Sequence, residues 1–531
     1  MSASTSSSAT GDGKPAVNPW FIAFAVMLAT FMEVLDTSIA NVALNHIAGN
    51  LSASTEEATW VLTSYLVSNA VVLPATGWLG RFFGRKRFLL VCIGIFTTAS
   101  ALCGLASSLG FLIFARIVQG AGGGALQPIA QAVLLESFPR EKRGAAMSVY
   151  AIGVVVAPIL GPTVGGWLTD SYSWRWAFYI NVPIGILAVV LCSVLLVDPP
   201  YLKDERPGSI DFVGFGLLTV WIGCLQIMLD KGQDEDWLSS NFIRWLAFGA
   251  VVGFVAFLIW ELRVKQPIVN LRILRDRNLA IGSLLLFLLG AILYGTTSIL
   301  PLFLQNLLSY TSLQAGLVMS PRGLGAIVGS IIAGRILANP KIDGRAWIGG
   351  GFAVLGLSMY IFGGLTTQIA PGNVVWPIII SGFATTTIFV PMATFSMATV
   401  SRENISEGTG LTNLLRNLGG SVGISAISTV VARNAQTHQA LMVGRTSQYN
   451  PVFNSQLIKI RGALTPQVGS AAAHDQSYRL IYQTLQQQAS LWSYLDLFRL
   501  LVLVCLVCVP LVFLFKKPKR GAVSKDLIAA H

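Results

Sequence analysis

Residues 20–44 read WFIAFAVMLATFMEVLDTSIANVAL, an apolar run that contains two acidic residues, Glu33 and Asp36. A helix of about 20 apolar residues crosses a hydrocarbon core of roughly 30 Å, so this run predicts a membrane-spanning helix. A charged side chain at mid-membrane costs about 2.5–3.5 kcal/mol on translocon scales, and such groups are usually functional. The stretch therefore predicts an integral membrane protein with chemistry inside the bilayer.

Similar apolar runs recur along nearly the whole chain, and the first is too long for a cleaved signal peptide. The predicted spans are 20–44, 58–80, 88–108, 111–135, 144–168, 174–197, 210–229, 242–262, 278–304, 312–337, 346–366, 374–400, 408–432 and 491–515. The fold class is therefore an all-α integral membrane protein with about 14 transmembrane helices.

The composition agrees with that class, since 53% of the residues are hydrophobic and 11% are charged. Soluble domains carry roughly 25% charged residues. The net charge of +12 comes from Arg and Lys in short loops after every even-numbered span. Basic loops of this kind mark the cytoplasmic side of a membrane protein. The pattern predicts that both termini are cytoplasmic, and it argues against nucleic-acid binding.

The spans divide the chain into segments, with two six-helix groups separated by an additional pair of helices. The predicted segments are a disordered cytoplasmic tail (1–19), an N-terminal bundle (20–197), a cytoplasmic linker (198–209), two central helices (210–262), a C-terminal bundle (263–515) and a basic cytoplasmic tail (516–531). The two six-helix groups echo each other weakly, as in transporters built from duplicated halves.

The polar segment 433–490 interrupts the C-terminal bundle and is predicted to be an external loop or small subdomain. Tyr478, Ile481, Tyr482 and Leu485 recur at helical spacing, which predicts an amphipathic helix leading into the last span. Loops longer than about 12–15 residues are usually functional or disordered. The segment is therefore either a docking site for a partner protein or an unstructured spacer.

Glu33 and Asp36 lie three residues apart and share one helical face. Two neighbouring carboxyl groups in a low-dielectric environment are costly to ionise together, so such a pair can load and release a proton near neutral pH. Asp36 is expected to be the principal proton carrier, Glu33 its auxiliary and Arg116 the counter-charge. The alternatives are structural carboxylates satisfied by a neighbouring helix and a structural Arg anchored on the backbone.

Further polar residues interrupt the spans and are assigned to a substrate cavity. Arg116, Gln119 and Gln127 share a face of the fourth span, which should point into the bundle or a wet cavity. The expected cavity residues are Asn41, Gln119, Gln127, Asn413, Arg416 and Asn417. Arg322, near the start of the tenth span, is expected to snorkel to a membrane interface.

Signatures of enzymes and of ATP-driven pumps are absent from the sequence. It contains no G-x-x-x-x-G-K-[ST] loop and no H-E-x-x-H motif, and its six cysteines all fall in apolar runs. The sequence predicts no metal site, no cofactor and no enzymatic activity. A transporter without a nucleotide site depends on an ion gradient, here the proton gradient.

Four stretches resemble motifs of the major facilitator superfamily, specifically its fourteen-helix drug:proton antiporters of the EmrB type. They are 35–44 (LDTSIANVAL), 116–120 (RIVQG), 161–166 (GPTVGG) and 174–185 (WRWAFYINVPIG). The third resembles the antiporter motif of the fifth helix, to which Pro158, Gly161, Pro162, Gly165 and Gly166 are assigned. The resemblance implies the major facilitator fold, in which two bundles rock around a central site.

A fifth stretch, 77–86 (GWLGRFFGRK), resembles the family's cytoplasmic gate loop, to which Gly77, Gly84, Arg85 and Lys86 are assigned. The chain has Arg81 where the superfamily usually has Asp. The family's carboxylate latch cannot be carried over to that position.

The resemblance implies a multi-pass protein of the bacterial inner membrane that exports drugs or toxic amphipathic small molecules in exchange for protons. It also implies a tripartite system with a periplasmic adaptor (EmrA-like) and a TolC-like outer-membrane channel. Two alternatives stay open: a proton-coupled solute symporter or importer, and a channel or lipid-handling membrane protein. The identity of the substrate is beyond the sequence.

Overall fold

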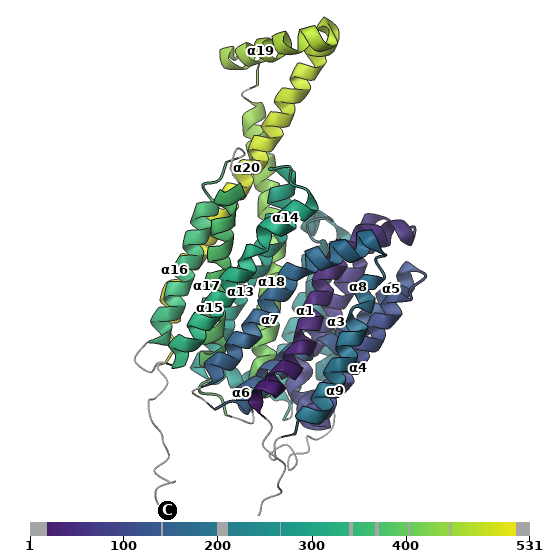
Figure 1. Ribbon diagram of the computed structural model, residues 1–531, viewed down its shortest axis with the longest axis vertical. Helices are drawn as coiled ribbons and strands as arrows, with labels where there is room; N and C mark the ends of the chain where they lie inside the picture. The colour runs from purple at the N-terminus through teal and green to yellow at the C-terminus, as the bar shows by residue number, and fades with distance from the viewer. Residues whose placement is uncertain are drawn as a thin grey trace, which may run out of the picture.

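The computed structural model describes residues 18–139, 142–198, 211–265, 267–338, 343–366, 371–401, 404–444, 446–447 and 449–516, and these form an all-helical structure (Figure 1). The first part contains α1 (Pro19–Asn50), α2 (Thr55–Ala58), α3 (Trp60–Phe83), α4 (Arg85–Gly104), α5 (Leu109–Gly123), α6 (Leu126–Ser137), α7 (Arg143–Ser171), α8 (Trp176–Tyr179) and α9 (Asn181–Leu195). The middle contains α11 (Phe212–Lys231), η2 (Trp237–Ser239), α12 (Asn241–Arg263) and η3 (Leu271–Arg275). The last part contains α13 (Arg277–Asn306), α14 (Ser312–Met319), α15 (Pro321–Ala338), α16 (Gly344–Phe362), α17 (Pro371–Ser396), α18 (Ile405–Val443), α19 (Pro451–Val468) and α20 (Ser470–Val512).

Within these described ranges, twelve helical segments are long and apolar enough to cross a membrane. The bent helix α7 brings this number to thirteen. The remaining predicted span, 58–80, corresponds to α3, whose polar residues lower its hydropathy although it packs inside the bundle. The fourth, sixth and tenth spans are each built from two short helices in tandem. The prediction of an all-α protein with many membrane spans is confirmed.

The N-terminal and C-terminal halves pack their helices by the same rule. In the first half, α1 packs against α7, α3 against α5, and α4 against α9. In the second half, α13 packs against α18, α15 against α17, and α16 against α20. Counted as spans within each half, these are the first with the fifth, the second with the fourth, and the third with the sixth. The weak repeat in the sequence therefore corresponds to a repeated packing arrangement.

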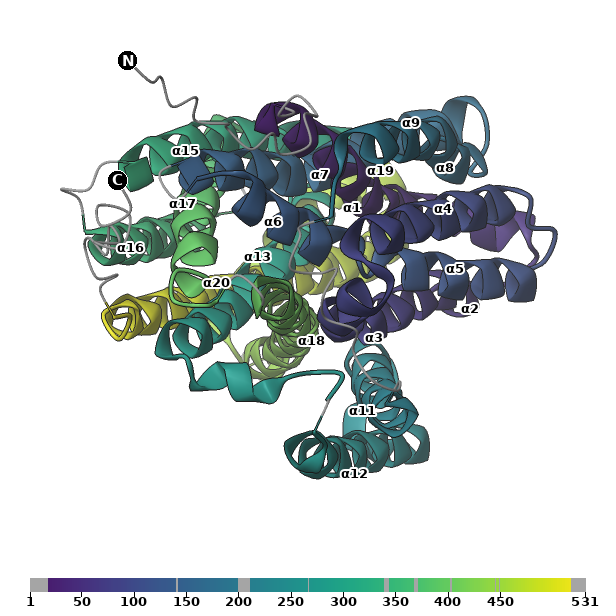
Figure 2. The same cartoon turned by 90° about the horizontal axis from the view of Figure 1, so that it is seen from below.

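The two central helices lie at the edge of the molecule (Figure 2). α11 contacts both α3 of the first half and α18 of the second, whereas α12 packs mainly on α11. The predicted linker 198–209 and both predicted tails lie outside the described residues, except at Asp198, Asn18, Pro19 and Lys516. The central pair therefore covers one edge of the seam between the halves.

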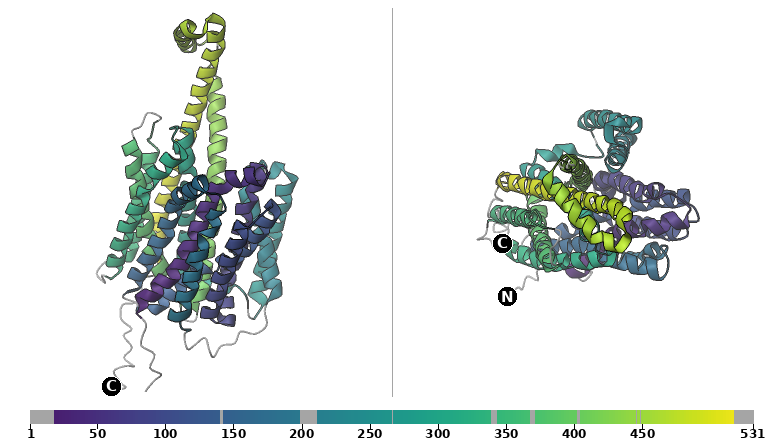
Figure 3. Two further views of the ribbon diagram at one scale, coloured as in Figure 1. Left: turned by 45° about the vertical axis from the view of Figure 1, so that its right-hand side comes forward. Right: turned by 90° about the horizontal axis from the view of Figure 1, so that it is seen from above.

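Segment 433–490 was expected to be an external loop or a small subdomain, and the structure shows that it is mainly helical. α18 continues to Val443, α20 begins at Ser470, and α19 crosses the tip between them (Figures 1 and 3). At roughly 1.5 Å per residue, α18 and α20 are each about 60 Å long, twice the thickness of a hydrocarbon core. The two helices therefore project beyond the bundle as an arm, defined here as residues 433–490.

Side-chain contacts join α18 to α20 in the arm and at its base. The His438 Nε2 atom lies 2.8 Å from Asp496 Oδ2, and the Gln439 amide donates a 3.0 Å hydrogen bond to the Tyr482 hydroxyl. The prediction of a helix around 478–485 that leads into the last span is confirmed, because α20 is continuous through it.

The halves meet through α3, α6 and α7 on one side and α15, α17 and α18 on the other. Hydrogen bonds across this seam come from residues 407–416 of α18, near the end of that helix opposite the arm, and from a contact between α7 and α15. The Ser148 hydroxyl donates to the Ser330 carbonyl (2.7 Å), and the Thr409 hydroxyl donates to the Pro128 carbonyl (3.1 Å). The seam is therefore closed on the side away from the arm.

Candidate functional site

Asp36 is fully buried in the middle of α1 and forms an ion pair with Arg116 of α5. Arg116 Nη1 lies 2.6 Å from Asp36 Oδ2. The side-chain amides of Gln119 and Asn181 donate hydrogen bonds of 2.9 and 2.7 Å to Asp36 Oδ1. A buried ion pair is tolerated when hydrogen bonds satisfy the remaining lone pairs, as they do here.

Arg116 is itself held by groups of the first half. Its Nε donates to the Val61 carbonyl at 3.1 Å, and its Nη1 also donates to Gln119 Oε1 at 2.8 Å. The guanidinium carbon lies 4.1 Å from the centre of the Tyr65 ring, within the range of a cation–π contact. The predicted neighbours Asp36, Arg116 and Gln119 therefore lie together, and all of them belong to one half of the molecule.

Asn181, Tyr65 and Phe178 complete this cluster and were not predicted as site residues. Phe178 also lies beside Arg116, with 5.6 Å between the guanidinium carbon and the ring centre. Phe178 and Asn181 both belong to the stretch 174–185, which sequence reasoning used only to recognise a family. Asn181, a polar residue between Ile180 and Val182 in this stretch, was the available signal.

Glu33 lies one turn from Asp36 and is also buried, but its surroundings differ. The Gln127 amide donates to Glu33 Oε2 at 2.7 Å, and the Asn69 amide donates to Oε1 at 3.2 Å. The Tyr65 hydroxyl is 3.5 Å from Oε1. Within the described residues, no Arg or Lys lies within ion-pair distance of Glu33, so its hydrogen-bond partners are neutral groups.

Gln127 links Glu33 to the second half of the molecule. Its Oε1 accepts a hydrogen bond from the guanidinium of Arg416 on α18, while its amide nitrogen serves Glu33. A second amide contact between the same helices lies nearby, where Asn413 donates to Gln131 Oε1 at 2.6 Å. Gln127 and Gln131 of α6 thus both bind side chains of α18. Of these two amides, Gln127 is also hydrogen-bonded to a carboxyl group, that of Glu33.

Arg416 lines a narrow apolar cavity between the halves. The cavity is bounded by α7, α13, α17 and α18 and has a volume of about 10 Å³. The Phe389 ring centre lies 5.6 Å from the guanidinium carbon, and Arg416 Nε has no hydrogen-bond partner among the described residues. A volume of this size holds at most one water molecule, so the cavity is collapsed in this conformation.

The remaining predicted cavity residues are dispersed. Asn417 is half-buried on α18, one residue beyond Arg416. Asn41 is exposed on α1, and Gln119 faces the Asp36 cluster instead of the cavity. Arg322 is buried and donates a 2.7 Å hydrogen bond to the Thr297 hydroxyl, so the expected snorkelling is wrong. Its burial follows from the close packing of α15 on α17.

The predicted antiporter motif brings α7 against α1. A Cβ on Gly161 would lie 2.1 Å from Ser38 Oγ, and a Cβ on Gly165 would lie 3.2 Å from the Ile39 Cα atom. The Ser38 hydroxyl donates to the Pro158 carbonyl at 3.0 Å. Small residues permit this close approach beside Asp36.

α7 bends by 40° between Pro158 and Thr163. The side chain of Pro162 lies outside the described residues, and Gly166 has open space around it. The motif therefore joins two features, a bend in α7 and a close contact with the helix that carries both carboxyl groups.

The predicted gate loop connects α3 to α4, and Gly84 adopts a left-handed φ of +82° between them. Arg85 pairs with Glu136, and the backbone N–H of Lys86 donates to Asp198 Oδ1 at 2.7 Å. These contacts lie within the first half. They hold the loop against its own bundle.

Next to the predicted gate loop, Arg81 makes one of the contacts between the halves at this end, an ion pair with Glu407 of α18. A Cβ on Gly77 would lie 2.8 Å from the Glu407 Cα atom, so α3 and α18 approach closely there. Glu407 was missed by sequence reasoning, although an acidic residue in the first turn of the thirteenth span complements the unusual Arg81. At the position where the superfamily usually has Asp, Arg81 therefore supplies the positive partner of an ion pair whose carboxylate comes from the other half.

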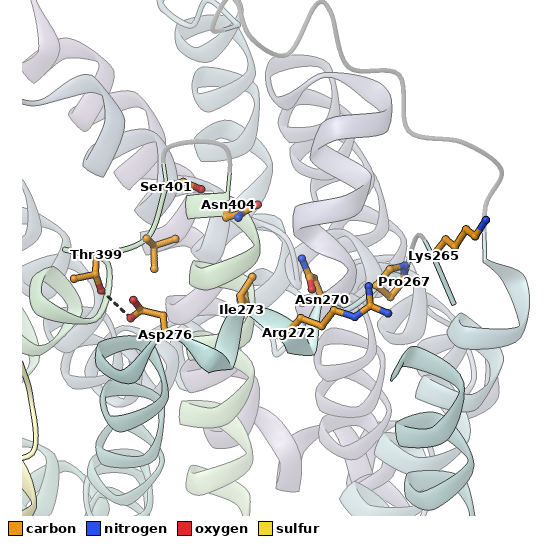
Figure 4. A pocket seen from close by; sticks show the side chains of 10 residues that line it. Lys265, Pro267, Asn270, Arg272, Ile273, Asp276, Thr399, Ser401 and Asn404 are labelled. Carbon is orange, nitrogen blue, oxygen red and sulfur yellow. Dashed lines mark hydrogen bonds between the residues drawn. The ribbon is translucent and has the colours of Figure 1, made fainter. Parts of the chain in front are cut away.

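A larger cavity, of about 420 Å³, lies away from all these residues (Figure 4). It is formed by the connections from α12 to α13 and from α17 to α18, and Thr399 donates to Asp276 Oδ1 at 2.7 Å in its wall. Because its walls are the ends and connections of helices, it is not the central cavity expected of a transporter. Among the described residues, no group of three or more His, Cys, Asp or Glu side chains is arranged to hold a metal ion.

Comparisons with known proteins agree with this architecture. The family model of the Major Facilitator Superfamily matches residues 26–424. The chain is 40% identical to the multidrug export protein EmrB of Haemophilus influenzae, over 82% of this chain and 84% of that protein. It is 37% identical to EmrB of Escherichia coli, over 94% of this chain and 95% of that protein.

Two further matches extend the comparison. The fatty acid resistance protein FarB of Neisseria gonorrhoeae is 36% identical, over 95% of this chain and 97% of its own length. The crystal structure of the human organic anion transporter MFSD10 superposes with a TM-score of 0.56 at 13% identity, covering 93% of this chain and all of that one. At this low identity, the superposition shows the shared fold alone. The chain therefore belongs to the Major Facilitator Superfamily, in the branch of the EmrB multidrug export proteins, and is a transporter rather than an enzyme.

Proposed function

We propose that this protein exports amphipathic small molecules from the cytoplasm in exchange for protons, by alternating access between its two halves. Export of drugs is supported by the names of relatives that match over nearly the whole chain. The observation that carries proton coupling is the buried Asp36–Arg116 ion pair on α1, one turn from Glu33. Carboxyl groups at this depth are the proton-binding groups that an exchanger needs.

Asp36 is the principal proton carrier in this proposal. In this proposal Asp36 is ionised while it is paired with Arg116, whose Nη1 atom lies 2.6 Å from Asp36 Oδ2. Protonation removes the negative charge and with it the main attraction for Arg116, which keeps its bonds to Val61 and Gln119. α1 is then free to shift against α5. Antiport follows if the substrate and the proton are not bound in the same state.

Purified protein in proteoliposomes tests this function. Adding a substrate of the EmrB class to the cytoplasmic face should release protons, and an imposed proton gradient should drive export. Asp36→Asn should abolish gradient-driven export while substrate exchange continues, because the side chain keeps its shape but cannot ionise. Asp170→Asn, an exposed carboxyl at the end of α7, serves as the matched control and should behave as wild type. Undiminished pH-dependent antiport in Asp36→Asn would reject the assignment.

We also propose a location in the bacterial inner membrane with both termini in the cytoplasm and the arm outside. The basic loops support this orientation. A cysteine at Tyr449, which is 86% exposed in the arm, should react with an impermeant maleimide in intact spheroplasts. A cysteine at Lys142, at the opposite end of the bundle, should react only after permeabilisation. The reverse pattern would reject the orientation.

The arm is proposed to dock a periplasmic adaptor that connects to an outer-membrane channel. Its helices lie far beyond the bundle and carry exposed apolar side chains, including Val452 and Ile458 (each 69% exposed). Replacing residues 444–469 by a short Gly/Ser turn removes α19 and keeps α18 and α20. This variant should lose adaptor pull-down and retain antiport in vesicles. Pull-down at the wild-type level would reject docking at the tip.

A further inference from the structure

Gln127 occupies an unusual position, because its two polar ends serve the two halves of the molecule. The amide nitrogen donates to Glu33 of the first half at 2.7 Å, and the amide oxygen accepts from Arg416 of the second half. Gln127 is buried, so water does not readily replace either partner. A guanidinium has donors only, and therefore the oxygen of the amide must face Arg416 for this bond to exist. The nitrogen is then directed at Glu33.

The orientation of the amide depends on the charge of Glu33. An ionised carboxylate is an acceptor only and can take the donors of Gln127, Asn69 and Tyr65 together. In a protonated carboxyl group, one oxygen carries a hydrogen. That oxygen becomes a hydrogen-bond donor and is a weaker acceptor for the donors of Gln127, Asn69 and Tyr65. The Gln127 amide satisfies the new donor by turning its oxygen toward Glu33, which turns its NH₂ group toward Arg416. Two donors then face each other, and the bond between the halves is lost.

We propose that Gln127 is a positioning residue that converts protonation of Glu33 into release of the seam between α6 and α18. This inference rests on the proposed proton-coupled function and adds to it the route from proton to movement. With Glu33 ionised, the seam is tied on the side away from the arm. With Glu33 protonated, this side opens.

The direction of this effect suits an exporter. The tied side is the predicted cytoplasmic side, where the halves also meet through Arg81 and Glu407. A proton that arrives from outside would open the cytoplasmic side, and loss of the proton to the cytoplasm would close it again. An inward proton movement therefore resets the transporter for the next substrate.

Other charged or titratable groups lie around Glu33. They are Asp36 on α1, Tyr65 on α3, Arg116 on α5, Tyr150 on α7 and Arg416 on α18. Asp36 and Arg116 are paired with each other inside the first half. Among the described residues, Gln127 is the direct partner of Glu33 that also binds a residue across the seam.

Spin-label distances across the two ends of the full-length protein in nanodiscs test the proposal. The native cysteines are replaced by alanine and wild-type antiport is checked first. One label pair, at Lys142 and Ser401, reports the seam on the side away from the arm, and a pair at Ser171 and Asn306 reports the other end. All four positions are exposed. Lowering the pH from 8 to 5 should lengthen the 142–401 distance in the parent protein.

Substitutions at Gln127 should change this response in opposite ways. Gln127→Met has no amide, so the 142–401 distance should be long at every pH. Gln127→Glu places an acceptor opposite Arg416 whatever the state of Glu33, so the distance should be short at every pH. Glu33→Gln has a permanent donor and should resemble the protonated form.

Gln131→Met is the matched control. Gln131 joins the same two helices through Asn413 but is not hydrogen-bonded to a carboxyl group. This variant should weaken the closed state and keep a pH-dependent distance. A full pH response in Gln127→Met would overturn the proposal, as would loss of the response in Gln131→Met to the same extent. If those results occur while the parent protein performs antiport, the proposed function stands and this inference fails. Absence of antiport in the parent would reject the proposed function itself.

Discussion

Glu33 and Asp36 lie one turn apart on the same helix, yet they are satisfied in different ways. Asp36 has a cation and two amides, all from its own half. Glu33 has neutral donors, and one of them reaches across the seam to Arg416. The Asp36–Arg116 pair lies inside the first half and stabilises that half. Glu33 is bound to Gln127, which also binds the second half, so the charge of Glu33 can control the contact between the halves. We therefore expect the two carboxyl groups to have different tasks.

The largest effect is expected from breaking the pair of Asp36. Arg116→Met leaves a buried carboxylate without its cation, which costs about 3–5 kcal/mol of stability. Thermal unfolding of the detergent-solubilised protein should show this loss. The double variant Asp36→Asn/Arg116→Met removes both charges and should recover much of the stability but no gradient-driven export. A double variant no more stable than Arg116→Met would show that the two side chains are not coupled.

An intermediate effect is expected at Arg81 and Glu407, which join the halves without touching either carboxyl group of α1. Glu407→Gln should shift the 142–401 distance toward the open form at every pH and leave the size of the pH-dependent change intact. The charge-exchanged variant Arg81→Glu/Glu407→Arg should restore the closed distance. A lost pH response in Glu407→Gln would mean that this pair, and not Gln127, carries the proton signal.

A smaller stability effect is expected for Glu33→Gln. Its partners are neutral, so the change exchanges hydrogen bonds worth about 1 kcal/mol each instead of exposing a buried charge. Thermal unfolding should therefore change far less than in Arg116→Met, while the pH dependence of the 142–401 distance is lost. Comparable destabilisation in the two variants would contradict the contrast drawn between the two sites.

The smallest effect is expected for Asn41→Ala. This residue was predicted to line the cavity but is exposed on α1. Export rates and substrate affinity should stay within about twofold of wild type, since exposed substitutions away from a site usually change free energies by less than about 0.5 kcal/mol. A large loss of substrate affinity in Asn41→Ala would show that Asn41 does contact the substrate.

The spans and the neighbourhood of Asp36 were predictable because both depend on local rules. Apolar length defines a membrane helix, and a carboxyl group buried in one needs a cation, for which Arg116 was the available candidate. Contacts between distant segments were less accessible. Asn181 and Glu407 take part through packing of α9 on α1 and of α18 on α3, which no spacing in the sequence reveals.

The arm was predicted only in part, for a different reason. Its sequence has too few apolar residues for a membrane helix, so hydropathy left a loop and a small subdomain open. Helical spacing indicated a helix only around 478–485. Its helices are instead continuations of α18 and α20, and they hold each other through contacts such as His438 with Asp496. Extension of an existing helix avoids the cost of nucleating a new one.

The continuity of α18 and α20 from the bundle into the arm has a mechanical consequence. α18 carries Arg416 and Glu407 at one end and enters the arm at the other, so it is a rod that crosses the whole membrane. In its partner α20, residues 470–490 lie outside the bundle and form a lever of roughly 30 Å. A tilt of about 10° would move the tip of this lever by about 5 Å. A protein bound to the tip would be displaced in each transport cycle, without contacting the exported compound.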